Sequence, residues 1–291
     1  MMTTKEFLSG MRPKTLAAAF IPPIVAFSLS YGSNFSPSYS MLFFCLGLAI
    51  SLQIATNFYN DAIDFLKGAD VDRVGPSRIV SQGNVSYKHA LWVGHFFILL
   101  TLTFALPIFI KGGILFVILG ILSVLLAYGY TGGPFPLAYL GLGELFVFLF
   151  FGLVATIGSY YLLNSSISLT IIIQACVVGI MSTLLIAINN FRDRFTDIKV
   201  NKRTLATRMK TDSYLLFLDL LIFLPYLIAL YLFIFVKLEY IFVLLATGIA
   251  HKIHGVIHNY EAEAELNQAL SLAGKHLVVF CLLMSLANVW N

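Results

Sequence analysis

Nine runs of mainly apolar residues follow one another along this chain, and they constrain its fold more than any other feature. Each run is close to the length of about 20 residues that a helix needs to cross a lipid bilayer. Because the runs are continuous rather than alternating, they predict helices and not the strands of a membrane barrel. The expected spans lie near 15–32, 40–59, 90–110, 113–129, 144–163, 169–190, 214–236, 239–256 and 270–289.

The overall composition supports a membrane protein. Hydrophobic residues make up 59% of the chain and charged residues 11%, whereas soluble domains contain about 25% charged residues. A soluble fold of 291 residues could not bury so much apolar surface. We therefore expect an all-α polytopic membrane protein in which residues 1–291 form a single transmembrane domain.

The positions of the lysines and arginines indicate how the helices are oriented. If the N-terminus is cytoplasmic, every basic residue except Lys111 and Lys237 falls in a cytoplasmic segment, as the positive-inside rule expects. The same orientation puts two large polar segments, 60–89 and 191–213, on the cytoplasmic face and the C-terminus on the other. The net charge of +4 is then a topology marker rather than a sign of nucleic-acid binding. We expect a multi-pass protein of the bacterial inner membrane.

Two clusters of amides and carboxylates stand where the large polar segments begin. The first contains Asn57, Asn60, Asp61 and Asp64, and the second contains Asn189, Asp193 and Asp197. In both clusters an asparagine is followed four residues later by an aspartate, and residues at that spacing share one face of a helix. The similarity indicates a weak internal repeat in which two equivalent helices face one cavity.

Carboxylates gathered in this way repel one another unless a cation lies among them. Their hard oxygen atoms suit Mg²⁺, which commonly binds one or two carboxylates together with substrate phosphates. The expected metal ligands are Asp61, Asp64, Asp70, Asp193 and Asp197. Basic side chains that can hold phosphate oxygens lie nearby: Lys67, Arg73, Arg78, Arg192, Lys202 and Arg203. The combination predicts a diphosphate site; the alternative, a set of solvated loop charges, accounts less well for two matched clusters.

Several stretches resemble the UbiA-type intramembrane prenyltransferases, and most of all their menaquinone branch, which uses 1,4-dihydroxy-2-naphthoate. They are RPKTL, NFYNDAIDFLKGAD, GPSRIVSQG, YTGGPFPLAYLGLGE and NNFRDRFTDIKVNKRTLA, in this order between residues 12 and 210. The final third of the chain resembles that family only in its number of helices. The sequence departs from the family pattern where Asn201 precedes Lys202, and where Arg208-Met209-Lys210 replaces a Leu-Gly ending.

The resemblance implies helices around a central cavity, with a lateral opening for a long lipid tail. It implies that both aspartate motifs hold Mg²⁺-bound polyprenyl diphosphate, whose prenyl group passes to the aromatic acceptor with loss of carbon dioxide, giving demethylmenaquinone. The catalytic residues would be Asp61, Asp64, Asp193, Asp197 and Tyr130. The substrate-binding residues would be Asn57, Asn60, Lys67, Arg73, Arg78, Asn189, Arg192, Lys202 and Arg203.

Three features leave alternatives open. Tyr130 could orient or deprotonate the acceptor, or could be an interfacial tyrosine at a helix end. Glu144 is interpreted as a charge at a helix N-terminus, with contact to the cavity as the lesser alternative. The stretch with His251, His254, His258, Glu261 and Glu265 is interpreted as a polar interfacial helix in preference to a metal site, because spacing alone is weak evidence.

Other functions remain as alternatives to the predicted prenyl transfer. A prenyltransferase with another acceptor, such as 4-hydroxybenzoate or homogentisate, would share both aspartate motifs. An ion-coupled transporter would also carry intramembrane carboxylates, but here the acids gather at the ends of spans and come with phosphate-binding bases. A phospholipid phosphotransferase would need an Asp-Gly motif that neither polar segment contains.

Overall fold

The computed structural model describes the whole chain except residues 1, 34–35, 70–73, 77 and 291, and the described part contains helices and no strand. The helices are α1 (Thr4–Met11), α2 (Pro13–Gly32), α3 (Tyr39–Leu66), α4 (Tyr87–Gly112), α5 (Ile114–Gly129), η1 (Leu137–Tyr139), α6 (Gly143–Val147), η2 (Phe148–Val154), α7 (Ala155–Asn164), α8 (Leu169–Lys199), α9 (Leu205–Arg208), α10 (Thr211–Phe235), η3 (Leu238–Ala246), α11 (Thr247–Asn259), η4 (Glu263–Glu265) and α12 (Leu266–Val289).

The long helices form a bundle that fits an integral multi-pass membrane protein. Within the described residues, eight helical segments are long and apolar enough to cross a membrane. Three of them join shorter elements end to end: α6 with η2 and α7, η3 with α11, and η4 with α12. Helix α5 is a ninth apolar helix of 16 residues. The nine predicted spans are thus confirmed as helices, with α5 the shortest of them.

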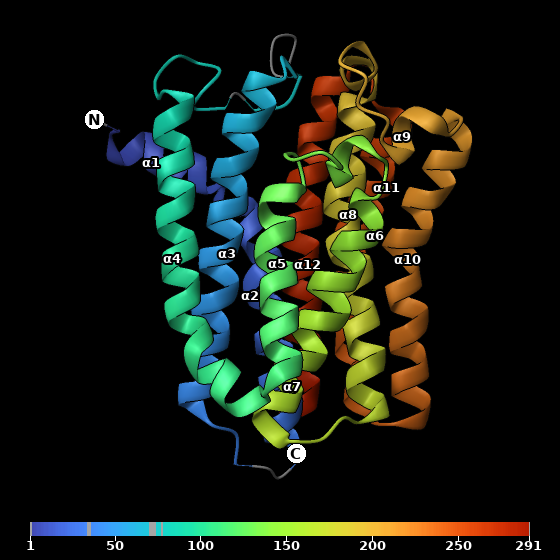
Figure 1. Cartoon of the computed structure of the whole chain (residues 1–291). Coiled ribbons are helices and arrows are strands. Elements are labelled where there is room, and N and C mark those ends of the chain that lie inside the picture. Colours follow the sequence, from blue (N-terminus) through green and yellow to red (C-terminus); the bar gives the residue numbers. More distant parts are fainter. Residues whose placement is uncertain (1, 34–35, 70–73, 77, 291) are drawn as a thin grey trace.

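The chain runs up and down through the bundle, so that its connections alternate between two ends (Figure 1). Helix α1 and the described parts of both large polar segments, 60–89 and 191–213, lie at the upper end in Figure 1, and α12 ends at the lower end. The expectation that the two polar segments share one face is therefore confirmed. The two aspartate motifs are brought to the same end of the bundle.

Both motif-bearing helices are longer than the sequence predicted. The spans expected at 40–59 and 169–190 continue to Leu66 in α3 and to Lys199 in α8, so the aspartates stand in the last helical turns and not in loops. Asparagine and aspartate often interrupt helices because their side chains compete for nearby backbone groups. In α3 these side chains are buried and bind partners on other segments, and in α8 Asn189 and Asp193 bind the side chain of Arg192, so the helical backbone stays intact.

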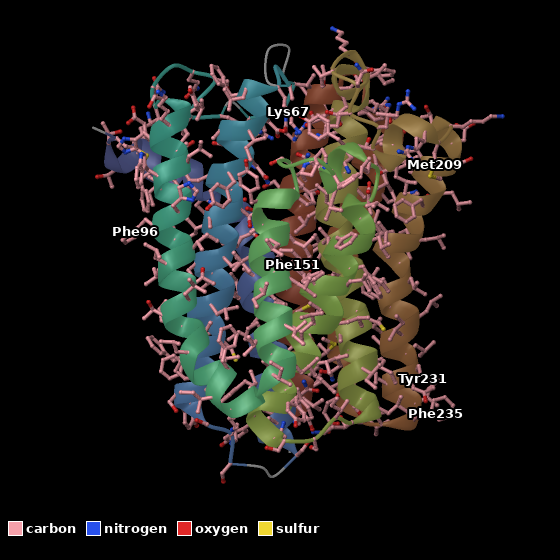
Figure 2. All side chains as sticks on the ribbon, in the orientation of Figure 1. Lys67, Phe96, Phe151, Met209, Tyr231 and Phe235 are labelled. Atoms are coloured by element: carbon pink, nitrogen blue, oxygen red, sulfur yellow. The ribbon has the colours of Figure 1, made fainter. Side chains whose placement is uncertain are left out.

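The most buried helix is α8, which stands at the centre of the larger hydrophobic core. In its apolar window 78% of the residues are buried, against 22% in the peripheral α4. Large apolar side chains on the outer helices instead point away from the bundle, as Phe96 and Phe235 do in Figure 2. An apolar outer surface is stable against lipid chains, whose interior offers no partner for polar groups.

The π-helical turn η2 lies against α8 at a point where the two backbones nearly touch. A Cβ atom on Gly152 would lie 2.6 Å from Cα of Gly179 and 2.9 Å from the carbonyl oxygen of Ala175. Only glycine allows such an approach, which is the usual role of small residues between membrane helices. π-Helical turns are rare and often occur at functional sites, and this one carries Phe150 and Phe151 into the cavity described next.

Candidate active site

A cavity of about 360 Å³ lies inside the bundle, between the polar ends of α3 and α8. Its polar wall is formed by Arg12, Thr15, Asn57, Asn60, Asp64, Arg78, Tyr130, Thr131, Asn189, Asn190 and Lys202. The rest of the wall is mostly apolar and comes from α2, α3, α4, α5, η2, α7 and α8. The two motifs, far apart in sequence, therefore face one space.

The carboxylates of the first motif are buried and paired with arginines. Oδ2 of Asp64 lies 2.5 Å from Nη1 of Arg78, which also donates to the carbonyl oxygen of Asn60 at 2.8 Å. Asp61 pairs with Arg12 from the start of α2, and Nε of Arg78 lies 3.6 Å from its Oδ1. Burial of a carboxylate without such a partner would cost several kcal/mol per charge, and the arginines supply the compensating positive charge.

The asparagines of the first motif tie α3 to its neighbours. The amide of Asn57 donates to the carbonyl oxygen of Met11 at 2.8 Å and to Oγ1 of Thr15 at 3.2 Å. Oδ1 of Asn60 accepts a hydrogen bond of 2.9 Å from Oγ1 of Thr131. These bonds fix the orientation of the motif relative to α2 and to the segment after α5.

The second motif is organised around a buried arginine. Arg192 donates to both carboxylate oxygens of Asp193, at 2.8 and 2.7 Å, and to Oδ1 of Asn189 at 2.8 Å. Its Nη1 donates to Oδ1 of Asn267 at 2.9 Å. Gly75 from the polar segment between α3 and α4 lies against the guanidinium, where a Cβ would come within 2.4 Å of Nη2. The segment after the first motif is thus packed onto the second.

Asp197 is one helical turn further along α8 and pairs with Lys202. The distance from Nζ of Lys202 to Oδ1 of Asp197 is 3.2 Å. The other carboxylate oxygen, Oδ2, is buried and has no hydrogen-bond partner among the described residues. A buried carboxylate oxygen without a partner is unfavourable, and a bound cation would supply that partner.

Tyr139 connects the two motifs. Its hydroxyl donates to Oδ1 of Asp64 at 3.1 Å, and its ring lies 4.0 Å from Nζ of Lys67 and 5.9 Å from Nζ of Lys202. Its carbonyl oxygen accepts from the backbone N–H of Arg203 at 3.1 Å. Burial, and then the charge of Asp64, raise the pKa of Tyr139, so its phenol stays a hydrogen-bond donor.

Comparison with known proteins identifies the family to which this chain belongs. Residues 19–273 match the model of the UbiA prenyltransferase family. This chain belongs to the UbiA prenyltransferase family. It is 36% identical to the 1,4-dihydroxy-2-naphthoate octaprenyltransferase of Haemophilus influenzae, over 70% of this chain and 69% of that one. The enzymes of the same name from Escherichia coli and Mycobacterium tuberculosis are 35% and 32% identical over similar shares, 71% and 72% of this chain and 69% and 71% of theirs.

Solved structures of UbiA homologues share the fold at low identity. A UbiA homolog from Archaeoglobus fulgidus bound to GPP and Mg²⁺ superposes with a TM-score of 0.65 at 16% identity, covering 98% of this chain and 99% of that one. The apo structure of a UbiA homolog from Aeropyrum pernix K1 gives a TM-score of 0.64 at 14% identity, covering 90% and 97%. The expected architecture of about nine helices around a cavity is confirmed as a UbiA fold.

Most of the residues predicted from the sequence meet at this UbiA cavity. Asn57, Asn60, Asp64, Arg78, Tyr130, Asn189 and Lys202 line it. Asp61, Asp193, Asp197 and Arg192 stand immediately behind this wall in the ion pairs described above. Asp70 and Arg73 lie outside the described residues.

Two predicted phosphate partners lie beside the cavity rather than on its wall. Nζ of Lys67 donates to the carbonyl oxygen of Thr131 at 2.5 Å, and burial lowers the pKa of this lysine. Figure 2 shows Lys67 at the end of the bundle that carries both motifs. Arg203 is exposed and lines a surface hollow that it shares with Lys202.

Arg12 and Tyr139 reach the UbiA site without having been predicted there, and Glu144 is closer to it than the preferred interpretation of a helix-end charge implied. Arg12 and Tyr139 contact the first motif, and both belong to stretches whose resemblance to the family could have pointed to them. Glu144 does begin α6 as expected, but its carboxylate is buried: Oε1 accepts from Asn190 at 2.9 Å and from Tyr214 at 3.1 Å. Its Oε2 has no partner among the described residues, so this acid is an interior group and not a solvated cap.

The donor set of the two motifs fits a divalent cation. The carboxylates of α3 and α8 belong to ion pairs on or beside the polar wall of one cavity, and Oδ2 of Asp197 still has unused acceptor capacity. Such hard oxygen ligands are those that Mg²⁺ binds. The surrounding arginines and lysines supply positive charge for an anion that would accompany the metal.

Proposed function

We propose that this UbiA-family protein transfers a polyprenyl group from a polyprenyl diphosphate to 1,4-dihydroxy-2-naphthoate, with loss of the ring carboxylate as carbon dioxide. The observation that carries the proposal is the convergence of two acid–base clusters on one cavity that is otherwise apolar. The names of the relatives from Haemophilus influenzae, Escherichia coli and Mycobacterium tuberculosis support the choice of acceptor.

The polar end of the cavity would hold the diphosphate. Asp61, Asp64, Asp193 and Asp197 would hold Mg²⁺, with Asp70 as a further ligand. Bound there, Mg²⁺ would neutralise the diphosphate and make it a better leaving group. Arg78 and Lys202 line the cavity, where their guanidinium and ammonium groups would donate hydrogen bonds to phosphate oxygens. Lys67, Arg73, Arg192 and Arg203 would add positive charge around the same anion.

The apolar part of the cavity would hold the prenyl chain and keep water away from the reacting carbon. When the C–O bond to the diphosphate breaks, its electron pair leaves with the diphosphate and an allylic cation remains. Water would trap that cation, so the site must exclude it. Phe146, Phe150 and Phe151 line the cavity, and Figure 2 shows Phe151 about halfway along the bundle. Aromatic faces of this kind can stabilise a cation.

Tyr130 would position the acceptor rather than deprotonate it. It lines the cavity, and its pKa is raised by burial and by the negative charges of Glu144, Asp64 and Asp197. A phenol in that setting stays neutral and can donate or accept one hydrogen bond to an acceptor hydroxyl. The ring carbon of the acceptor that carries the carboxylate then attacks the allylic cation and forms a bond to it. Carbon dioxide leaves from the same ring carbon, and its bonding electron pair restores the aromatic ring.

Replacing Tyr130 with phenylalanine is therefore expected to lower kcat/KM by about threefold to tenfold, the worth of one neutral hydrogen bond. Because the raised pKa keeps the phenol neutral, the pH–rate profile between pH 6 and about pH 9 should keep its shape. Initial rates measured across that range for both proteins test this. Loss of a titrating limb in Tyr130→Phe would show instead that Tyr130 acts as an acid or base.

Activity with defined acceptors tests the proposed function directly. Membranes that contain the protein, supplied with Mg²⁺, a polyprenyl diphosphate and 1,4-dihydroxy-2-naphthoate, should form a prenylated naphthoquinol and release carbon dioxide. Parallel reactions with 4-hydroxybenzoate and homogentisate serve as controls. If only 4-hydroxybenzoate or homogentisate is prenylated, the protein is a prenyltransferase but the assignment of the naphthoate acceptor is wrong. If none of the three acceptors is prenylated, the proposed function is wrong.

We propose that the motif-bearing end of the bundle lies on the cytoplasmic side of a bacterial inner membrane, because among the described residues the lysines and arginines other than Lys111 and Lys237 lie toward that end. A single cysteine introduced at exposed Asn84 or Asn201 should react with an impermeant maleimide in inverted vesicles and stay unlabelled in intact cells. Ser166, in the connection at the other end, should show the reverse. Opposite behaviour of Asn84 and Asn201 would contradict this topology.

A further inference from the structure

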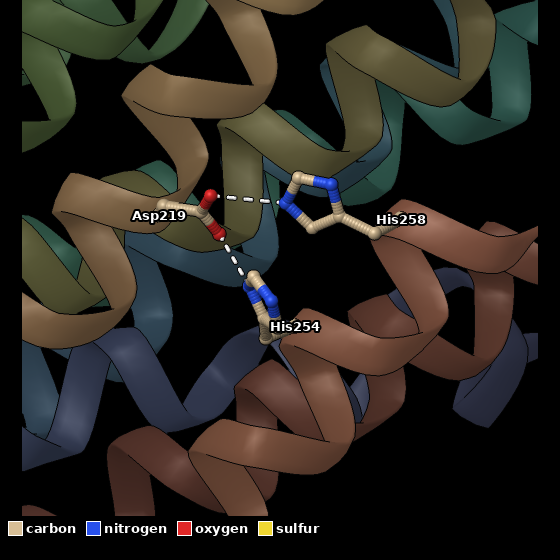
Figure 3. A group of neighbouring side chains, drawn as sticks. All are labelled: Asp219, His254 and His258. Atoms are coloured by element: carbon tan, nitrogen blue, oxygen red, sulfur yellow. Dashed lines mark hydrogen bonds and ion pairs between the residues drawn. The ribbon is translucent and has the colours of Figure 1, made fainter.

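A second group of chemically active side chains lies on the outside of the bundle, away from the cavity. Asp219 of α10 faces His254 and His258 of α11 (Figure 3). Oδ1 of Asp219 lies 2.7 Å from Nδ1 of His254, and Oδ2 lies 2.9 Å from Nε2 of His258. One carboxylate is therefore held between two imidazoles that come from a neighbouring helix.

The geometry of this group is that of a metal site. His254 and His258 are one helical turn apart, a spacing that puts two imidazoles on one helix face in known zinc motifs. One ligand atom from each of the three residues lies within 4.8 Å of the other two. Around a tetrahedral Zn²⁺ with bonds of about 2.0–2.2 Å, ligand atoms stand about 3.3 Å apart. Small side-chain rotations would bring all three to that separation.

We propose that Asp219, His254 and His258 bind a late first-row divalent cation, of which Zn²⁺ is the reference, and that this ion clamps α10 to α11. Imidazole nitrogen favours zinc, copper and nickel, while Mg²⁺ prefers ligands that are all oxygen. The side chains are 23%, 43% and 33% exposed, in the order Asp219, His254, His258, so water can complete the coordination. The backbone of both helices holds the ligands in place.

This cation is distinct from the one expected at the aspartate motifs. Asp219, His254 and His258 are not among the residues that line the cavity, and α10 and α11 carry neither motif. The two sites also differ in ligand chemistry, because the motifs offer oxygen atoms and this group offers two nitrogens. A metal that prefers nitrogen should therefore occupy the outer site even when Mg²⁺ saturates the inner one.

His251 provides a matched control on the same helix. His251 stands three residues before His254 and is exposed. Its Nδ1 contacts the carbonyl oxygen of Thr247 in its own helix. Its ring packs beside Phe223 and it is not part of the three-residue group. If the metal bound to exposed histidines non-specifically, replacing His251 would weaken metal binding as much as replacing His254 or His258.

Metal titration of the purified protein tests the proposal. Tag-free protein in detergent, in excess Mg²⁺, is titrated with Zn²⁺ by calorimetry, and Cu²⁺ bound to the same preparation is examined by electron paramagnetic resonance. We expect one equivalent of Zn²⁺ and hyperfine coupling from two imidazole nitrogens. His254→Gln, His258→Gln and Asp219→Asn should each weaken binding by at least about tenfold, since even outer-shell partners of a metal contribute that much, while His251→Gln should leave it unchanged.

The melting temperature is a second measurement, and it reports whether the bound ion stabilises the folded protein. Zn²⁺ should raise the Tm of the wild-type protein and of His251→Gln in excess Mg²⁺, because a ligand that binds only the folded state stabilises it, and it should leave the Tm of His258→Gln unchanged. Absence of a Zn²⁺ equivalent in excess Mg²⁺, or equal weakening by His251→Gln, would overturn the proposal. In that case the three residues form an interhelical hydrogen-bond cluster only.

Discussion

Replacing Asp64 with asparagine is expected to lower the rate of prenyl transfer by about a hundredfold to a thousandfold, the typical cost of removing one group that stabilises charge in a transition state. Asp64 is buried on the cavity wall and paired with Arg78 at 2.5 Å. The amide keeps the size of the side chain but removes the negative charge that would bind Mg²⁺. Asp193→Asn should have an effect of the same order from the other motif. Initial rates with saturating substrates measure both.

The control for these variants is Asp212→Asn, which removes an exposed carboxylate at the start of α10 on the same side of the bundle. Its rate should equal that of the unchanged protein. Thermal unfolding in detergent should show that each variant is folded at the assay temperature. A rate near that of the wild type in Asp64→Asn or Asp193→Asn would remove the argument for a metal held by both motifs.

Replacing Arg192 with methionine is expected to cost about 3–5 kcal/mol of stability, because it leaves a buried carboxylate without its counter-charge. Arg192 is buried, donates to both oxygens of Asp193, and also binds Asn189 and Asn267. These contacts join two parts of α8 to α12. Equilibrium unfolding in mixed detergent micelles measures the change in free energy.

Two further variants show whether charge is the cause. The double variant Arg192→Met with Asp193→Asn should recover much of the lost stability, since the uncompensated charge is gone. Arg208→Met, which removes an exposed guanidinium that donates to the carbonyl oxygen of Leu140, should change stability by no more than about 0.5 kcal/mol. Equal losses in Arg192→Met and in the double variant would assign the effect to packing instead.

The elements of the site that could be predicted from sequence are those with a local signal. The spacing of Asn57 and Asp61, or of Asn189 and Asp193, follows from the period of a helix, and the charge bias fixed which ends of the helices belong together. Helix ends were predicted less well: α3 and α8 continue through the acids to Leu66 and Lys199. In α3 the polar side chains have partners on other segments, such as Met11 and Arg78, and a local pattern does not show such partners.

The contacts that a local pattern does not show are those between distant segments. Arg12 reaches Asp61, Tyr139 reaches Asp64, and the amide of Asn190 reaches Glu144. Each pair depends on how two helices or loops pack, and a single sequence contains no record of that packing. The histidines of α11 illustrate the same limit, since the sequence grouped them with Glu261 and Glu265 whereas the fold brings Asp219 to them.

From the amino-acid sequence one can predict a membrane protein with nine apolar helices and two acid–base motifs on one face, because hydrophobicity, charge and helical period act over one or a few turns. The resemblance of both motifs to UbiA prenyltransferases comes separately, from short stretches that match that family. The tertiary structure alone decided which counter-charge each aspartate has, that Glu144 is an interior acid, and that Asp219 meets His254 and His258. Those features depend on contacts between segments far apart in the chain, because a buried charge takes its properties from whatever the fold places beside it.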